Sequence, residues 1–303
     1  MALHIFANLV TSFGTAANNR AENEGNITTL QKIIWKGQTH STVSAESIRF
    51  AIRRQLADFE KTNRRWDENL RANVWEDHKF SGWADTNQKV YIDDDLLGYM
   101  TAEASNEEGT AGSANVRRAV LEVTRAVSLT PWTGDVTFNA ASPGATPSAA
   151  KKGTNPVPYG TEVHATRYQF GVAMTPQRLR DPQRAKNAID AICSLRTVAG
   201  NHGRFLYDFA PEVVIFRVTT DPAPRLLYCF DTNDAGHSIN ADVLFQRIEC
   251  GDIDGEELYV GVSDLNSQIA KSLAAKGAHV AGVKATAKSV INNVHSLIMT
   301  AKS

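Results

Sequence analysis

The sequence has few cysteines, and they are spaced in a way that excludes two kinds of site. Cys193, Cys229 and Cys250 lie far apart and form no CxxC pair, so neither a disulfide framework nor a structural zinc site is indicated. None of the eight histidines forms an HExxH motif or pairs with a cysteine at ligand spacing. We therefore expect no metal site and no cofactor.

Long apolar runs and the usual catalytic signatures are also missing. No segment approaches the roughly 18 to 20 apolar residues of a membrane helix, and the N-terminus lacks the pattern of a signal peptide. No P-loop, dinucleotide fingerprint or nucleophile elbow occurs. With 303 residues, 42% of them hydrophobic, the chain can bury a substantial core. The sequence predicts a cytoplasmic globular protein that is not an enzyme.

The formal net charge of −1 conceals blocks of opposite sign. Residues 1–57 carry 6 basic and 3 acidic side chains, 58–112 carry 6 and 13, 113–204 carry 12 and 5, and 205–303 carry 8 and 12. Two basic blocks separated by an acidic one favour a chain that brings its positive segments to one nucleic-acid surface. Ordinary local fluctuation of charge is the alternative.

The first 57 residues hold the most suggestive pattern. Residues 3–10 predict a buried strand, and a loop rich in turn formers, which contains NNRAENEG, follows it. A helix is expected from about Ser44, with Ser44 or Thr42 as its N-cap. Its core stripe recurs at every fourth position, as Ile48, Ile52 and Leu56.

Two arginines of this helix form a second stripe. Arg49 and Arg53 each follow a core position by one residue, which rotates them by about 100° around the helix axis. Together with loop amides they could neutralise the phosphates of a polyanion. The alternative is two solvated arginines on an amphipathic helix.

Residues 61–112 differ from the rest of the chain. They contain three tryptophans and several acidic clusters, and we expect an inserted, mainly helical subdomain. The carboxylates of Asp93, Asp94 and Asp95 are adjacent, so they point in different directions and lack partner ligands for a metal. We predict that they form a solvated helix start, favoured by the helix dipole.

A second insertion is expected between residues 128 and 164. This stretch holds 5 of the 10 prolines and four glycines, and few large aliphatic residues, so it cannot form the core. Trp132 at its start and the pair Lys151 and Lys152 favour an extended hairpin or arm. A strand is predicted at 165–176, where the chain returns to the sheet.

The segment AGNHGRF at 199–205 is the second candidate for nucleic-acid contact. Its two glycines permit close approach of the backbone, and Asn201, His202 and Arg204 can reach a phosphate or a ribose. An ordinary turn between a helix and a strand is the alternative.

Taken together, these segments resemble a known family. The strand, the NR-acidic loop and the Ser-initiated helix, followed in order by RAVSLTPW, GTEVHATRYQFGVAMT and AGNHGRFLYDFAPEVVIFRVT, are similar to the backbone subunit of type I CRISPR Cascade complexes. The likeness is to the DevR/Cst branch, which is usually found in subtype I-B. It spans about residues 10–220, and we expect it to extend over the whole chain.

The resemblance implies an α+β fold. Its parts would be an RRM-like palm, which is a modified ferredoxin-like βαββαβ sheet, a helical fingers insertion and a hairpin thumb. We expect the palm in two parts, at 1–60 and 166–303, with the fingers at 61–127 and the thumb at 128–165.

The resemblance also implies a non-catalytic function in antiviral defence. Family members polymerise head to tail along the guide RNA (crRNA), as a helical filament, and present its spacer for pairing with target DNA in an R-loop, beside other Cascade subunits. Onto this sequence it carries Arg20, Arg49, Arg53 and the thumb. Phe50 stands where the family often has a basic residue, and Glu46 adds a negative charge nearby. With the candidates from the residues themselves, the predicted RNA-binding set is Asn19, Arg20, Lys36, Ser44, Arg49, Arg53, Trp132, Lys151, Lys152, Asn201, His202 and Arg204.

Two other functions stay open. A metal-dependent endoribonuclease that cuts target RNA, as in related type III backbone subunits, would have to use Glu22 or Glu24. A DNA-binding autoregulator is the third hypothesis.

Overall fold

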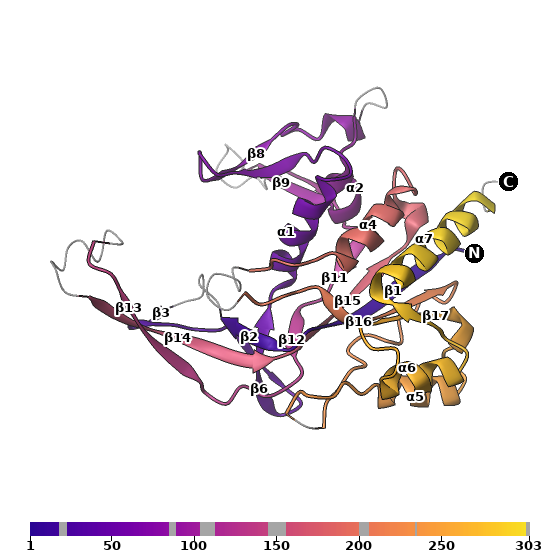
Figure 1. Cartoon of the computed structure of the whole chain (residues 1–303). Helices are drawn as coiled ribbons and strands as arrows, with labels where there is room; N and C mark the ends of the chain where they lie inside the picture. The colour runs from indigo at the N-terminus through magenta and orange to yellow at the C-terminus, as the bar shows by residue number, and fades with distance from the viewer. Residues whose placement is uncertain are drawn as a thin grey trace.

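A nine-stranded mixed sheet forms the centre of the computed structural model (Figure 1). In its middle, β1 (His4–Thr11) runs antiparallel to both β15 (Tyr168–Met174) and β16 (Pro211–Thr219). The strands on the β15 side are β11 (Leu121–Val123), β12 (Ala126–Ser128), β6 (Gln38–Val43) and β5 (Lys32–Trp35), and those beyond β16 are β17 (Leu258–Val262) and β18 (His279–Gly282). The structure describes residues 1–17, 23–84, 89–103, 113–144, 156–199, 206–233 and 235–300.

Helices cover both faces of this sheet. Ile5 and Leu9 of β1 belong to a core shared with α1 (Ala45–Leu56), α4 (Arg184–Cys193) and α7 (Val283–Thr300). Phe6 and Val10, which point the other way, belong to a second core with α5 (Asp242–Glu249) and α6 (Gln268–Ala275). Because both of its faces are buried, β1 reads as a nearly continuous apolar run, as the sequence predicted. No helix in these described ranges is long and apolar enough to span a bilayer.

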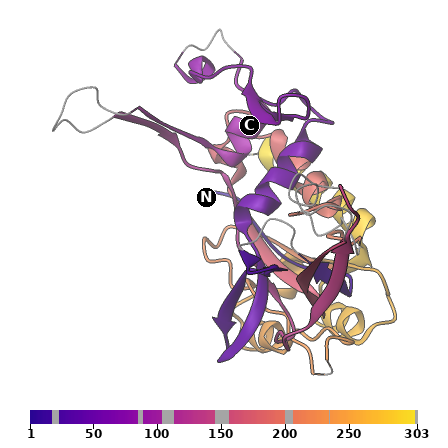
Figure 2. The ribbon, with the colours of Figure 1, turned by 90° about the vertical axis from the view of Figure 1, so that its left-hand side faces the viewer.

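The insertion between α1 and β11 consists mainly of strands in its described part. It contains two antiparallel hairpins, a 3₁₀ turn and one short helix: β7 (Arg64–Asp67) with β8 (Ala72–Trp75), Ser81–Trp83, α2 (Ile92–Leu97), and β9 (Tyr99–Glu103) with β10 (Ser113–Arg117). The prediction of a mainly helical insertion is therefore wrong. One reason is local: Asp67 Oδ1 accepts the N–H groups of Asn69 and Leu70, both at 3.0 Å, and closes a hairpin turn. In Figure 2 the β9–β10 hairpin projects away from the body.

A long hairpin lies where an arm was predicted. Its strands β13 (Val136–Ala141) and β14 (Val157–Thr166) are antiparallel and extend away from the body (Figure 1). Three short strands support its base: β2 (Gly14–Ala17), β4 (Ile27–Thr28) and, paired with β4, β3 (Asn23–Glu24). The α+β class is confirmed.

The three aspartates of α2 are buried, and the prediction of a solvated helix start is wrong. Asp93 accepts the N–H groups of Asn63 (2.7 Å) and Arg64 (3.1 Å), and Asp94 accepts Asn63 Nδ2 (2.8 Å). The carboxylate of Asp95, with no exposed surface, accepts from the N–H groups of Arg180 and Asp181 and from the guanidinium groups of Arg117 and Arg184. Each carboxylate is thus buried because the surrounding chain supplies donors that the local sequence did not reveal.

Candidate nucleic-acid interface

Helix α1 begins and packs as the sequence predicted. Ser44 is its N-cap, and the Ser44 Oγ accepts the N–H of Ser47 at 3.2 Å. Ile48, Ile52 and Leu56 have no exposed surface and join the core beneath the helix. This anchoring fixes which side chains of α1 remain at the surface.

The two arginines predicted to bind RNA are engaged with the insertion instead of facing solvent. Arg49 Nη2 donates to the carbonyl of Leu97, and Arg53 Nε lies 3.2 Å from Asp93 Oδ2. The Arg53 side chain is only 14% exposed, and burial lowers its pKa from the ordinary arginine value. Both arginines therefore tie α1 to α2.

A basic hollow of about 190 Å³ lies beside them, which we call the α1 hollow. It is lined by Ala51, Arg54, Gln55, Asp58, Leu195, Arg196 and Thr197. Gln55 Nε2 donates to the carbonyl of Ser194 at 3.2 Å, which joins α1 to the segment after α4. Arg54 and Arg196 are exposed, and neither guanidinium has a hydrogen-bond or ion-pair partner in the part of the chain that the structure describes. Among the described residues, nothing pairs with these two cations, which leaves them available to a ligand.

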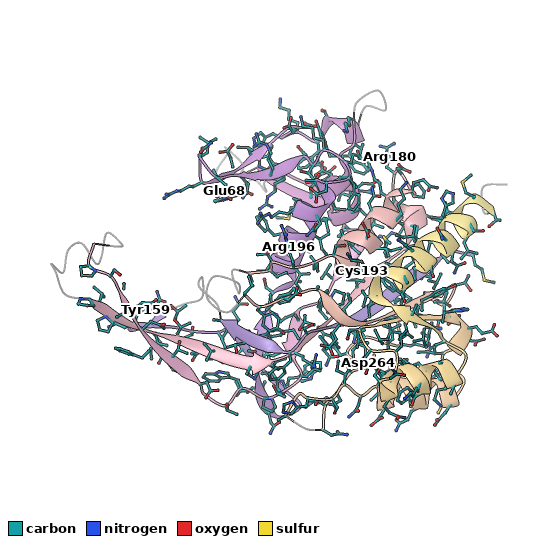
Figure 3. The ribbon with its side chains drawn as sticks, in the orientation of Figure 1. Glu68, Tyr159, Arg180, Cys193, Arg196 and Asp264 are labelled. Carbon is teal, nitrogen blue, oxygen red and sulfur yellow. The ribbon has the colours of Figure 1, made fainter. Side chains whose placement is uncertain are left out.

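The α1 hollow brings together two segments that the sequence singled out separately. Arg196 lies just before AGNHGRF, so the chain that leads into this candidate segment passes along α1. Asn201, His202 and Arg204 themselves lie outside the described residues, as do Asn19 and Arg20. Figure 3 shows Arg196 on the side of the molecule between the β7–β8 hairpin, which carries Glu68, and the β13–β14 hairpin, which carries Tyr159.

The described flanks of the two remaining loops also meet. Tyr207, which follows AGNHGRF, is buried, and its hydroxyl is 2.6 Å from Thr11 Oγ1 at the end of β1. A Cβ at Gly14 would lie 3.2 Å from the Tyr207 ring, so the start of β2 passes close to this tyrosine. The loop that contains Arg20 leaves from the far end of β2. The segment after AGNHGRF therefore lies beside the start of β2, the strand that leads to the Arg20 loop.

Trp132 lies at the base of the β13–β14 hairpin. Its Nε1 donates to the carbonyl of Val163 at 3.0 Å, and Lys32 Nζ lies 4.0 Å from the centroid of its ring. That lysine also forms an ion pair with Glu162, at 2.6 Å. One aromatic surface is thus already occupied by a cation. Lys151 and Lys152 lie outside the described residues.

His164 and Lys36 add no free charge to this surface. His164 Nδ1 is 2.7 Å from Ser41 Oγ, and burial lowers the pKa of its ring to about 4, so the ring is neutral at pH 7. Lys36, a predicted RNA contact, forms an ion pair of 2.6 Å with Asp231. Both partners of that pair are more than half exposed, so the pair is weak and exchangeable.

Comparisons with known proteins agree on one family. A family model described as "CRISPR-associated negative auto-regulator DevR/Csa2" matches residues 11–228. The chain is also 60% identical over 262 residues to the "CRISPR-associated protein Cas7/Cst2/DevR" of Myxococcus xanthus (strain DK1622), which covers 86% of this chain and 87% of that protein. The chain belongs to the DevR/Csa2 family of CRISPR-associated proteins. The resemblance found in the sequence is confirmed.

Two solved structures share the fold of this DevR/Csa2 protein. One is described as "CRISPR RNA-guided surveillance complex", with a TM-score of 0.56, 14% identity, and coverage of 96% of this chain and 99% of that one. The other, "CRISPR RNA-guided surveillance complex, pre-nicking", has a TM-score of 0.58 and 11% identity, and covers 96% and 100%. At such low identity the likeness concerns the fold.

Arg54 and Arg196 of this family member were missed by the sequence analysis. A signal was available for Arg54: it follows the core residue Ile52 by two positions, so it is rotated by about 200° and faces away from the core. Arg53, only about 100° away, stays close enough to be buried by the insertion. No comparable signal marks Arg196, because it lies in an irregular segment.

Proposed function

We propose that the chain is a non-catalytic, guide-RNA (crRNA) binding backbone subunit of a type I CRISPR surveillance complex, in subtype I-B. The observation that carries this proposal is the α1 hollow. There, Arg54 and Arg196 are exposed and their side chains have no partner among the described residues, and Arg196 lies on the side between two projecting hairpins, in a chain of the DevR/Csa2 family. Guanidinium groups neutralise phosphates and donate to them without reading the bases.

The strand order supports an RRM-like palm. From β16 through β1 and β15 to β12, four antiparallel strands follow the order 4-1-3-2, counted along the chain. Helix α1 follows the first of these strands and α4 follows the third, and both pack into the same core. This order agrees with the βαββαβ arrangement that a ferredoxin-like palm would have. We assign the palm to residues 1–60 and 166–303, the fingers to 61–127 and the thumb to 128–165.

In this function the RNA is held by its backbone and its bases stay free. Copies of the chain bind side by side along the spacer of the guide, each through the same surface, and present it for pairing with target DNA. A heterologous contact that does not close generates a helical filament, and binding on one RNA makes assembly cooperative. Other subunits of the complex cap the ends of this filament.

The decisive experiment is purification without added RNA, followed by addition of guide RNA. The copurified nucleic acid is extracted and sized, and assembly is followed by sedimentation and negative-stain electron microscopy. We expect RNA of discrete length and filaments on the guide, with affinity that depends strongly on salt and weakly on spacer sequence. A monodisperse, nucleic-acid-free monomer that ignores added guide RNA would contradict the proposal.

A DNA-binding autoregulator is the second candidate, because the matching family model carries the words "negative auto-regulator". Titration with duplex DNA and with guide RNA at the same salt concentration separates the two functions. Preference for RNA favours the backbone subunit, and equal affinity favours the autoregulator.

The endoribonuclease hypothesis is tested in the same assembled material. Glu24 is exposed on β3, and Glu22 lies outside the described residues. Magnesium-dependent cleavage of guide-complementary RNA that is lost on Glu22→Gln or Glu24→Gln would support a nuclease.

A further inference from the structure

A second hollow, of about 360 Å³, lies where the insertion meets the body; we call it the insertion hollow. It is lined by Trp83, Tyr99, Val116, Arg117, Arg118, Val120 and Arg178. The guanidinium of Arg117 lies 3.9 Å from the centroid of a Trp83 ring, and that of Arg180 lies 5.3 Å from it. The hollow thus combines aromatic and cationic side chains from the insertion and from the segment before α4.

Two side chains that line this hollow each carry a buried donor without an acceptor among the described residues. These donors are Trp83 Nε1 and Arg117 Nε. In the described part of the chain, no other buried side-chain nitrogen or oxygen atom lacks a hydrogen-bond partner. Arg117 uses its other donors: its Nη2 donates to Asp95 Oδ1 at 2.9 Å and to the carbonyl of Arg178 at 3.2 Å. Since both unsatisfied atoms are N–H groups, the missing partner is an acceptor.

The charge balance of the insertion hollow indicates an anionic ligand. Arg117 is paired with Asp95, and Arg118 with Glu122 at 2.8 Å. Arg178 is exposed at the end of a 3₁₀ turn, and its side chain has no ion pair or hydrogen bond within the described ranges. Arg180, whose guanidinium donates to the carbonyl of Trp83 at 3.5 Å, likewise forms no ion pair within the described ranges. Uncompensated guanidinium charge and two unsatisfied N–H groups match an anion that only accepts hydrogen bonds, such as a carboxylate or a phosphodiester.

The neighbouring surface favours a carboxylate carried by a protein. Met100 and Val116 are directly opposite each other on β9 and β10, and they are 69% and 59% exposed. An apolar pair beside the anion site suits an apolar side chain, whereas a phosphate backbone has nothing to bury there. The aromatic rings are also occupied, since Tyr99 stacks on Phe80 with centroids 3.7 Å apart, so they offer little room for a base.

The position of the hollow separates it from the α1 hollow. Figure 3 shows Arg180, whose guanidinium lies against Trp83, on the far side of the insertion from Glu68 and Arg196. RNA that follows Arg196 between the two hairpins would run along the opposite flank.

We propose that the insertion hollow docks a partner protein through a segment that presents a carboxylate next to an apolar side chain. The carboxylate pairs with Arg178 and accepts from Trp83 Nε1 and Arg117 Nε after a side-chain movement that uncovers these two atoms, while the apolar side chain packs on Met100 and Val116. This inference goes beyond RNA binding and does not depend on it.

The test uses the full chain, labelled with ¹⁵N, and follows the Trp83 indole N–H by NMR, assigned with Trp83→Phe. The main probe is the capped dipeptide acetyl-Asp-Leu-amide. The comparison probes are acetyl-Asn-Leu-amide, acetyl-Asp-Ser-amide and dimethyl phosphate. We expect a saturable shift with acetyl-Asp-Leu-amide, binding at least about tenfold weaker with the Asn peptide, in line with loss of a charge-assisted bond, and weaker binding with the Ser peptide.

The variants sharpen this result. Arg178→Ala should weaken the main probe by about tenfold, whereas Arg71→Ala, an exposed arginine elsewhere in the insertion, should change nothing. Far-ultraviolet circular dichroism verifies that both variants are folded. Absence of a saturable shift, equal binding of the Asn peptide, or tighter binding of dimethyl phosphate would overturn the proposal, and the last result would indicate nucleic acid. None of these outcomes affects the guide-RNA assay.

Discussion

Two clusters of like charge lie on either side of the contact between α1 and the insertion, and they are built in opposite ways. The acidic triplet of Asp93, Asp94 and Asp95 is buried, and every one of its carboxylates accepts hydrogen bonds from the surrounding chain. In the α1 hollow, Arg54 and Arg196 are exposed and have no partner in the described chain. The acidic cluster is satisfied by donors of the chain itself, whereas the two arginines have no side-chain partner among the described residues and are available to a ligand.

The difference teaches where to look for a binding surface. A run of charges says nothing by itself, because buried charges are kept only when they are paired and hydrogen-bonded. Arg53 and Arg54 are neighbours in sequence, but the first belongs to the acidic triplet's network and the second to the hollow. We therefore expect substitution of Arg53 to affect mainly the stability of the fold, and substitution of Arg54 to affect mainly RNA binding.

The largest effect is expected when the acidic triplet is broken at Asp95. Asp95→Ala removes the acceptor of Arg117 and Arg184 and of two backbone N–H groups, and leaves the Arg184 guanidinium, 10% exposed, with fewer partners. Loss of one partner of a buried ion pair costs about 3–5 kcal/mol. Urea unfolding measures the change in the free energy of unfolding.

The matched control is Asp58→Ala. Asp58 is exposed in the α1 hollow, and its removal should change the free energy of unfolding by no more than about 0.5 kcal/mol. If Asp95→Ala also fell below about 1 kcal/mol, the network would not stabilise the insertion as argued.

The next effect concerns RNA binding. Arg54→Ala combined with Arg196→Ala should weaken guide-RNA binding by about tenfold or more and reduce the slope of log affinity against log salt by about 1.4, for two phosphates on a single strand. The free energy of unfolding should stay nearly constant, because neither side chain has a partner in the described chain. Affinity is measured by filter binding at three salt concentrations.

Arg49→Ala combined with Arg53→Ala provides the opposite case. These side chains hold Leu97 and Asp93, so this pair should lower the stability of the insertion much more than it alters the salt slope. If it instead abolished RNA binding in a stable protein, while the Arg54 and Arg196 variant bound normally, the division between the two clusters would be wrong.

Sequence patterns predicted the parts of the fold that depend on local periodicity. The buried strand at 3–10, the start of α1 at Ser44 and its core stripe all follow from apolar spacing and capping chemistry. The hairpin at 136–166 followed from composition.

The prediction of a mainly helical insertion was wrong for a physical reason. Its turns are formed by side-chain contacts that periodicity does not report: Asn63 Oδ1, for example, accepts the N–H groups of Glu76 and Asp77 at 3.1 and 2.7 Å, across 13 and 14 residues. The prediction that the acidic triplet is solvated was wrong for the same reason, since its hydrogen-bond donors come from residues 53–64 and 117–184. Long-range partners decide whether such a charge is solvated or buried.

A smaller effect is expected from the middle aspartate of the triplet. Burial, and then the neighbouring charge of Asp93, raise the pKa of Asp94 to about 7 from its ordinary value of 3.8. Between these two values the folded state holds one more proton than the unfolded state, so stability falls as the pH rises through this window and levels off above pH 7.

Asp94→Asn tests this directly, because an amide resembles the protonated acid. We expect the variant to match the parent near pH 4, to lose most of the dependence on pH, and to be more stable than the parent at pH 8. The measurement is urea unfolding from pH 4 to pH 8. Parallel curves for the two proteins would contradict the assignment of the proton to Asp94.

The smallest effect is expected from substitutions of Ser44, which caps α1 and was also predicted to contact RNA. These substitutions test whether its hydroxyl stabilises the helix, binds RNA, or does both. Ser44→Ala removes the acceptor of the Ser47 N–H and should lower the free energy of unfolding by about 1 kcal/mol, whereas Ser44→Asn, also a good N-cap, should retain stability. Guide-RNA affinity should be unchanged in both variants if the hydroxyl serves the helix alone. A variant that keeps its stability and loses affinity would instead extend the RNA surface from the α1 hollow to the start of the helix.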